Sequence, residues 1–309
     1  MAQRGVLRPG FVQIKVLDMD AAIAHYRDHM GLDLVSIEAD GRAYFKAYDE
    51  FDRHSVVLRE ADAPGIDVMA FKVYCDEDLD VFAKRLNDID VKTKAIDANE
   101  QPSVGRRVRF ETPTGHVFDL YAEMALSDNG PMIKNPDVWR AEPRAMRIQR
   151  FDHCALIGID IAAAAKIFTD ALDFSITERA IIPDNGEPVA IFLTCSNKAH
   201  DIAFLGNPEH DGKLHHVSFN LEDWKDIGHA ADLISRYNIP LDIGPTRHGI
   251  TRGQTIYFFD PSGNRNETFS GGYSFYPDTP IREWTVDQMG KAIFYYEKEV
   301  HGRFVEVFT

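Results

Sequence analysis

The amino-acid sequence predicts an α+β fold with two domains, each built from two β-α-β-β-β modules. One observation behind this prediction is a repeated order of elements, and the other is an internal duplication. Three stretches of the first half have counterparts in the second: PGFVQIKVLDMDAAIAHYRDHMGL and QRFDHCALIGIDIAAAAKIFTDAL, HSVVLRE and HDIAFLG, and GRRVRFETPTGHVFDLY and GQTIYFFDPSGNRNETF. A duplication with a period of about half the chain explains all three pairs.

The first half shows the order of elements most clearly. Residues 11–17 alternate as a strand does, and Asp18 or Asp20 can cap a helix that runs to about Met30, where Gly31 ends it. The first module is completed by strands predicted at 32–38, 43–48 and 55–60. The second module has a strand at 68–74, a helix at 76–87 and strands near Val91, Val108 and Val117.

Loss of periodicity marks the domain boundaries. We expect an N-terminal domain at 1–124, a linker at 125–147, which contains a run of turn-forming residues, and a C-terminal domain at 148–271. Residues 272–309 form an extension that is rich in aromatic side chains. Those rings have to be buried, either over the cavity of the second domain or against a neighbouring subunit.

Composition and charge exclude several classes of function. The net charge of −15 argues against nucleic acid or an anionic membrane as a partner, because both attract basic surfaces. No stretch is apolar enough to span a bilayer, no signal-peptide core precedes residue 11, and no glycine motif for a nucleotide cofactor is present. The three cysteines are widely spaced, which is typical of reduced thiols, so we expect a cytoplasmic protein.

The stretch from residue 246 to residue 267 gathers three chemically useful side chains. TIYFF predicts a strand, DPSGN predicts a tight turn, and a second strand starts near Asn266. In the resulting β-hairpin, Tyr257 and Glu267 lie at corresponding levels of the two strands and can point into one cavity, with His248 just before them.

Comparing the two halves predicts a metal site in the second domain only. The alignment above matches three residues of the second half, His153, His216 and Glu267, with Gln13, Val68 and Asp119 of the first half. Two histidines and one carboxylate leave open positions on a metal and are typical of non-haem Fe(II). Mn(II) is a less favoured alternative, whereas zinc prefers a tetrahedral site and has no redox chemistry. His215 follows the alternation of a strand, so we expect it to face away from His216.

The spacing of these residues resembles a known family signature. The pattern runs from Thr246-x-His248 through Ile256-Tyr257-x2-Asp260-Pro261-x-Gly263 to Glu267. It is similar to the signature of the type I extradiol ring-cleavage dioxygenases of the vicinal-oxygen-chelate superfamily, and so are the stretches VLRPGFVQIKVLDM, KAHDIAF and LHHVSFNLE. The resemblance covers essentially the whole chain and implies the vicinal-oxygen-chelate fold.

The resemblance also implies an activity and roles for individual residues. An Fe(II) ion held by His153, His216 and Glu267 would bind a catechol and O2, and the ring would open beside the two hydroxyls to a 2-hydroxymuconic semialdehyde. His200 and His248 would act on oxygen and catechol, and Tyr257 would hydrogen-bond a substrate oxygen. His54 stands at the place of His200 in the first half, which favours a partly structural role for that histidine. A homo-oligomer, by resemblance a homotetramer, is implied as well.

Two other functions remain open from the sequence. One is a metal-dependent isomerase of the glyoxalase type, whose sites usually carry more carboxylate and do not need His200, His248 and Tyr257. The other is a non-catalytic ligand-binding protein on the same scaffold, which would lack the metal residues. Ring cleavage fits the sequence better than either.

Overall fold

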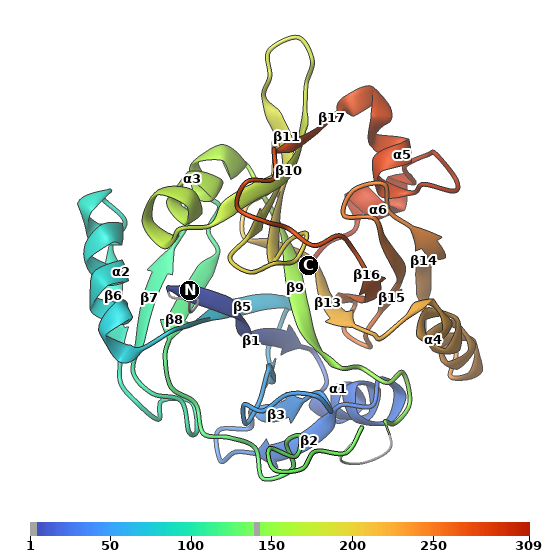
Figure 1. The fold of residues 1–309 in the computed structure, drawn as a ribbon. Helices are drawn as coiled ribbons and strands as arrows, with labels where there is room; N and C mark the ends of the chain where they lie inside the picture. The colour runs from blue at the N-terminus through green and yellow to red at the C-terminus, as the bar shows by residue number, and fades with distance from the viewer. Residues whose placement is uncertain (1–4, 139–142) are drawn as a thin grey trace.

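The computed structural model describes residues 5–138 and 143–309, which form two β-sheets with helices packed against them (Figure 1). The strands before residue 122 form the first sheet: β1 (Val6–Val16), β2 (Asp33–Ile37), β3 (Ala43–Lys46), β4 (Val56–Glu60), β5 (Gly65–Val73), β6 (Thr93–Ile96), β7 (Arg107–Glu111) and β8 (Val117–Tyr121). Their order in this eight-stranded sheet is β2-β3-β4-β1-β5-β8-β7-β6. Its helices are α1 (Met19–Ala24), the π-helix η1 (His25–His29) and α2 (Asp76–Asp88).

The second sheet repeats this arrangement. Its strands are β9 (Arg150–Gly158), β10 (Ser175–Ile181), β11 (Pro188–Thr194), β12 (Ile202–Gly206), β13 (Lys213–Asn220), β14 (Leu241–Arg247), β15 (Gly253–Phe259), β16 (Arg265–Gly271) and β17 (Arg282–Thr285). They lie in the order β14-β15-β16-β13-β9-β12-β11-β10-β17. The helices of this half are α3 (Ile161–Leu172) and α4 (Trp224–Arg236), followed by η2 (Val286–Gln288), α5 (Met289–Ile293) and α6 (Gly302–Glu306) in the extension.

The pairing of the strands confirms the predicted modules. In each module the first strand pairs in parallel with the last, as in β1 with β4 and β13 with β16. The two modules of each sheet then join through their first strands, which run antiparallel. The fold is therefore α+β with four β-α-β-β-β modules. The domain boundaries at 124, 147 and 271 stay predictions, and residues 139–142 of the predicted linker lie outside the described residues.

Two local predictions need correction. Asp18 caps the first helix by accepting a hydrogen bond from the backbone N–H of Ala21, but the α-helix ends at Ala24 and continues to His29 only as a π-helix. The strand expected near Val91 begins at Thr93. Within residues 5–138 and 143–309, no helix has the length and apolar character needed to cross a membrane.

The strand registers also correct one pairing of the duplicated halves. In the first sheet Ala70 of β5 pairs with both Phe11 and Asp119. In the second sheet Ser218 of β13 pairs in the same way with both His153 and Glu267. Phe11 and not Gln13 is therefore the counterpart of His153. The helix caps Asp18 and Asp160 correspond at the same spacing as Phe11 and His153, so the sequence alignment was displaced by two residues along this whole stretch.

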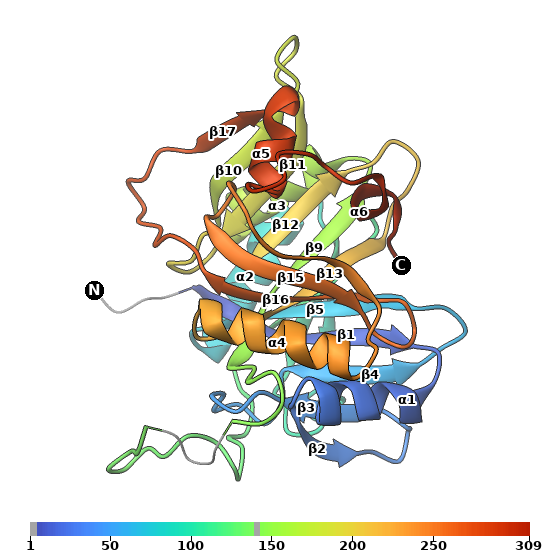
Figure 2. The same cartoon turned by 90° about the vertical axis from the view of Figure 1, so that its right-hand side faces the viewer.

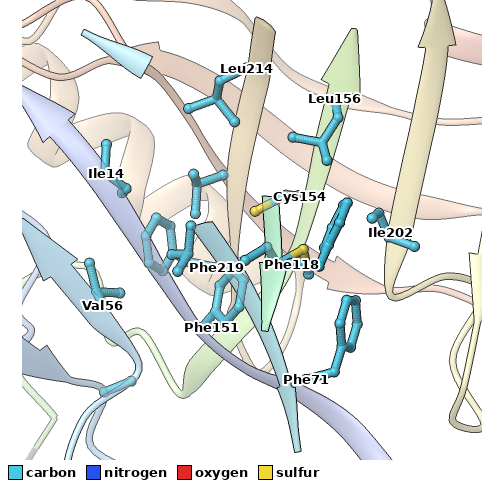
Figure 3. Close-up of a cluster of buried hydrophobic side chains, with 14 of the residues drawn as sticks. Ile14, Val56, Phe71, Phe118, Phe151, Cys154, Leu156, Ile202, Leu214 and Phe219 are labelled. Carbon is cyan, nitrogen blue, oxygen red and sulfur yellow. The ribbon is translucent and has the colours of Figure 1, made fainter. Parts of the chain in front are cut away.

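A continuous apolar core fills the space between the two sheets. Ile14, Val56, Phe71 and Phe118 come from the first half, whereas Phe151, Cys154, Leu156, Ile202, Leu214 and Phe219 come from the second (Figure 3). In the view of Figure 2, α4 lies beside the junction of the two sheets. Cys154 belongs to this core, so its neighbour His153 points to the opposite side of β9, where the predicted site lies.

The extension covers the second domain. Strand β17 adds to the edge of the second sheet beside β10, and the rings of Phe275, Phe294 and Phe304 are buried. Phe304, on α6, contributes to the cavity wall, as does Ile293 from the end of α5. Burial over the cavity is thus correct for part of the aromatic set, whereas Tyr276, Tyr295 and Tyr296 stay exposed.

Candidate metal centre

Three neighbouring strands bring the predicted metal ligands together. His153 lies on β9, His216 on β13 and Glu267 on β16, and one ligand atom from each lies within 4.8 Å of the others. The distance from Glu267 Oε2 to Nε2 is 3.1 Å for His153 and 3.4 Å for His216, and the two Nε2 atoms are 3.3 Å apart. All three side chains are buried, with Glu267 only 1% exposed.

The donor atoms of this cluster fit a cation. Glu267 Oε2 is buried and accepts no hydrogen bond, although both imidazole nitrogens lie near it. A buried carboxylate oxygen without a partner is energetically unfavourable unless an ion or proton satisfies it. Two nitrogens and one carboxylate oxygen at this spacing are a donor set that a divalent transition metal accepts.

The charges in the cluster favour the same conclusion. Burial acts to raise the pKa of Glu267, but His153 holds that pKa well below its usual range, so the carboxylate is ionised. Burial lowers the pKa of His216 well below its usual value and keeps this imidazole neutral. For His153, burial also acts to lower the pKa, but the carboxylates of Asp152 and Glu267 outweigh it and raise the pKa. The site therefore attracts one positive charge, which is supplied either by a proton or by a metal.

Residues outside the cluster hold each ligand in place. His153 Nδ1 lies 2.8 Å from Asp152 Oδ2, and Lys198 Nζ donates to Asp152 Oδ1 at 3.0 Å. Thr255 donates from Oγ1 to Glu267 Oε1 at 2.6 Å. Such partners orient the ligands of a metal and set the tautomer of its histidines. Thr255 was not among the predicted site residues, although it lies two residues before Tyr257 and so on the same face of β15.

His215 contradicts its predicted orientation. It lines the same cavity as His216, and the two Nδ1 atoms are only 2.7 Å apart. Leu214 pairs with Leu156 and His216 pairs with Ala155, so His215 is the additional residue of a β-bulge. The bulge interrupts the alternation of side chains on which the prediction rested.

Tyr257 and His248 meet beside Glu267. Tyr257 is paired with Glu267 across the hairpin, as predicted, and its hydroxyl lies 2.8 Å from His248 Nε2. His248 Nδ1 contacts the backbone carbonyl of Ile293, which can only accept, so Nδ1 carries a hydrogen and Nε2 accepts from Tyr257. Burial and the charge of Glu267 raise the pKa of Tyr257 well above its usual value, so the phenol stays protonated.

His200 stands on the other side of His153. The two ring centroids are 4.0 Å apart, and Phe192 packs edge-on against His200 at 5.3 Å. His200 Nδ1 is buried without a hydrogen-bond partner, and burial lowers the pKa of this residue well below its usual value. In the first half His54 packs against Phe11 in the corresponding way, at 5.7 Å. This repetition agrees with a contribution of the histidine to the module itself.

The six predicted residues line one cavity with a largely apolar wall. The rest of that wall includes Ala155, Phe192, Ala203, Leu205, Ile250, Phe269, Ile293 and Phe304. Among the described residues that line the cavity, none is lysine or arginine, and Glu267 is its one carboxylate. The cavity therefore suits a neutral molecule with a polar end near Glu267.

The equivalent position of the first domain is filled differently. Arg107 Nε and Arg109 Nε lie 2.9 Å and 2.7 Å from the carboxylate of Asp119. These residues take the places of Thr255 and Tyr257, and their guanidinium groups neutralise the buried carboxylate. Val68 and Phe11 replace the two histidines, so Asp119 is the one potential metal ligand at this position, and it is already paired with the two arginines.

Comparison with known proteins gives a consistent result. Residues 150–268 match the profile of the Glyoxalase/Bleomycin resistance protein/Dioxygenase superfamily, and residues 66–125 match that of the Catechol 2,3-dioxygenase-like N-terminal domain. Metapyrocatechase of Pseudomonas sp. (strain CF600) is 48% identical over 99% of this chain and 100% of its own length. The manganese-dependent 2,3-dihydroxybiphenyl 1,2-dioxygenase of Geobacillus genomosp. 3 is 26% identical over 94% of each chain. The structure of the 2,3-dioxygenase LapB from Pseudomonas sp. KL28 is similar with a TM-score of 0.89 and 46% identity, covering 93% of this chain and 99% of that one.

Proposed function

The chain belongs to the extradiol ring-cleavage dioxygenases, and from this membership we propose that it cleaves catechol, or a substituted catechol, with O2. Both oxygen atoms enter the product, a 2-hydroxymuconic semialdehyde, and the carbon–carbon bond next to the diol breaks. The observation that carries the proposal is the convergence of His153, His216 and Glu267 in one cavity with Tyr257, His248 and His200.

We propose Fe(II) as the metal and His153, His216 and Glu267 as its ligands. When bound, Fe(II) would supply open coordination positions for a diol and O2 and a path for electrons between them. A divalent ion with one carboxylate ligand keeps a net positive charge, which favours a deprotonated catechol oxygen. Mn(II) accepts the same donors, and a relative is named manganese-dependent, so loading with either ion should be compared.

The remaining polar residues of the cavity would hold the substrate and move protons. Tyr257 stays protonated and can donate its hydroxyl hydrogen to a catecholate oxygen, whereas the unprotonated Nε2 of His248 can accept a hydrogen bond from a catechol hydroxyl. His200 is neutral and has a nitrogen without a partner, so it can accept a proton and return it as the ring opens.

The apolar wall supports a narrower choice of substrate. Because no cationic side chain lines the described cavity, a ring carboxylate would be buried without a partner, at a penalty of several kcal/mol. We therefore propose catechol and alkyl-substituted catechols as substrates. Neither an isomerase nor a non-catalytic binding role is favoured by any feature of this cavity.

We also propose a homo-oligomer, by family resemblance a homotetramer, that acts in the cytoplasm. The exposed rings of Tyr276, Tyr295 and Tyr296 support burial against a second subunit. Light scattering on the purified protein gives the mass of the assembly, and a monomer at micromolar concentration would contradict this part of the proposal.

The activity is tested by a single-turnover experiment. The metal-free protein is loaded anaerobically with Fe(II), mixed with catechol and then exposed to oxygen, while oxygen uptake and the yellow product are followed. We expect one O2 consumed for each catechol opened. Oxygen consumption that yields hydrogen peroxide with the ring intact would contradict the proposal, and His153→Ala provides the inactive control.

A further inference from the structure

We infer that His215 is a positioning residue that fixes the tautomer and orientation of His216 and connects this ligand to the C-terminal segment. The inference rests on the proposed metal centre, because it assigns a partner to one of its ligands. In a regular strand the side chain of His215 would point away from the site.

The β-bulge creates the contact. In a regular strand neighbouring side chains face opposite sides, but the additional residue in β13 turns the ring of His215 toward that of His216, with centroids 5.0 Å apart. Both histidines are buried. Bulges commonly redirect a side chain beside a functional site, and here the redirected group is an imidazole with two usable nitrogens.

The hydrogen-bond chain has only one consistent direction for neutral imidazoles. His215 Nε2 lies 2.7 Å from the backbone carbonyl of Phe304, which can only accept, so Nε2 carries the hydrogen of His215. His215 Nδ1 is then an acceptor, and it lies 2.7 Å from His216 Nδ1, which must donate. His216 Nε2 is consequently left with a free lone pair, and this is the nitrogen that faces His153 and Glu267.

The far end of the chain is firmly held. Phe304 packs its ring against His215 at 4.7 Å and against Tyr257 at 4.9 Å. Arg265 donates to the carbonyls of Val307 at 2.8 Å and of His215 at 3.2 Å, and its side chain is 1% exposed. The carbonyl that orients His215 is thus part of a buried junction between α6, β13 and β16. The C-terminal segment would then belong to the metal centre and would be more than a cover for the cavity.

The consequence is a dependence of metal affinity chiefly on Nδ1 of His215, the acceptor for His216, with a smaller contribution from the Nε2 contact that holds the ring. Removing a partner of this kind typically weakens metal binding by about 10–100-fold. Asn at position 215 keeps an acceptor at the place of Nδ1 and loses the contact with Phe304. Gln keeps a donor near the place of Nε2 and loses the acceptor for His216, and Phe loses both.

The test measures the dissociation constant for Fe(II), anaerobically and against a competing chelator, in His215→Asn, His215→Gln and His215→Phe. We expect the Phe and Gln variants to bind about 10–100-fold more weakly than the parent, and the Asn variant to recover most of this loss. His116→Gln is the matched control, since His116 is also buried and its Nε2 contacts the carbonyl of Lys213 at 3.0 Å. The melting temperature of each metal-free protein reports general destabilisation separately.

The possible outcomes separate the inference from the proposed function. Equal Fe(II) affinity in the Asn and Gln variants, or an affinity of His215→Phe within twofold of the parent, would overturn the role of His215. If His215→Phe does not fold, the Asn and Gln variants decide the question alone. Unchanged metal binding in His216→Ala would instead overturn the metal centre itself.

Discussion

Thr255→Val tests whether the carboxylate of Glu267 is held ready for a metal. Thr255 is fully buried and its hydroxyl lies 2.6 Å from Glu267 Oε1. Valine preserves the shape and the β-branched side chain and removes only the donor. A hydrogen bond to a charged group contributes about 1.5–3 kcal/mol, so the metal-free variant should lose roughly this much stability. Metal affinity should fall by about 10–100-fold, because the carboxylate loses the partner that orients it.

The assay for this variant combines urea unfolding of the metal-free protein with an anaerobic chelator competition for Fe(II). Thr246→Val is the matched control, because Thr246 is buried on the neighbouring strand and donates to Glu297 at 2.8 Å, away from the metal ligands. Activity per bound metal should be largely retained in both variants. Fe(II) affinity in Thr255→Val within twofold of the control would refute the reasoning.

Three further predictions separate binding, chemistry and acid stability. His200→Phe should keep Fe(II) and anaerobic catechol affinity but lose about 10²–10⁴ in turnover rate, measured by single turnover, and normal turnover would contradict its role as a proton carrier. Tyr257→Phe should also weaken catechol binding, by about 1.5–3 kcal/mol in an anaerobic titration, and unchanged affinity would remove its proposed contact. Burial lowers the pKa of His25 to about 3. The imidazole is therefore neutral in the folded protein, and its Nε2 accepts a hydrogen bond from the side-chain amide of Asn266 at 3.0 Å. As the pH falls below about 6.5, His25 of the unfolded chain binds a proton that the folded protein does not bind. The free energy of unfolding therefore decreases, by about 2 kcal/mol at pH 5. In urea unfolding of the metal-free proteins, His25→Gln should lose about 2 kcal/mol less stability between neutral pH and pH 5 than the parent. The same pH dependence in the parent and the variant would contradict this prediction.

The module order and the hairpin could be predicted because they rest on local signals. Alternation, capping residues and the DPSGN turn depend on short stretches of chain, and Tyr257 pairs with Glu267 as the turn requires. The duplication then acted as an internal comparison, and its pairing of His216 with Val68 and of Glu267 with Asp119 agrees with the strand registers. The proximity of His153 was predicted too, although its counterpart proved to be Phe11.

The features that the sequence did not predict depend on strand register and on distant contacts. A bulge inserts one residue without a distinctive sequence, so the side of β13 that His215 faces does not follow from alternation. The pairing of Phe11 with His153 became clear only from the registers of the neighbouring strands. The carbonyl groups of Ile293 and Phe304 reach His248 and His215 from more than 40 residues away. Backbone groups of this kind leave no trace in composition, because any residue supplies a carbonyl.

The central claim is that the second half alone binds the metal, through His153, His216 and Glu267. Its most direct test is the number of Fe(II) ions bound per chain, measured anaerobically in the parent protein, His216→Ala and the buried-histidine control His116→Gln, each shown to be folded by circular dichroism. One ion per chain in the parent and in the control, with none retained in His216→Ala, is the result we predict. Full occupancy in folded His216→Ala would contradict the account.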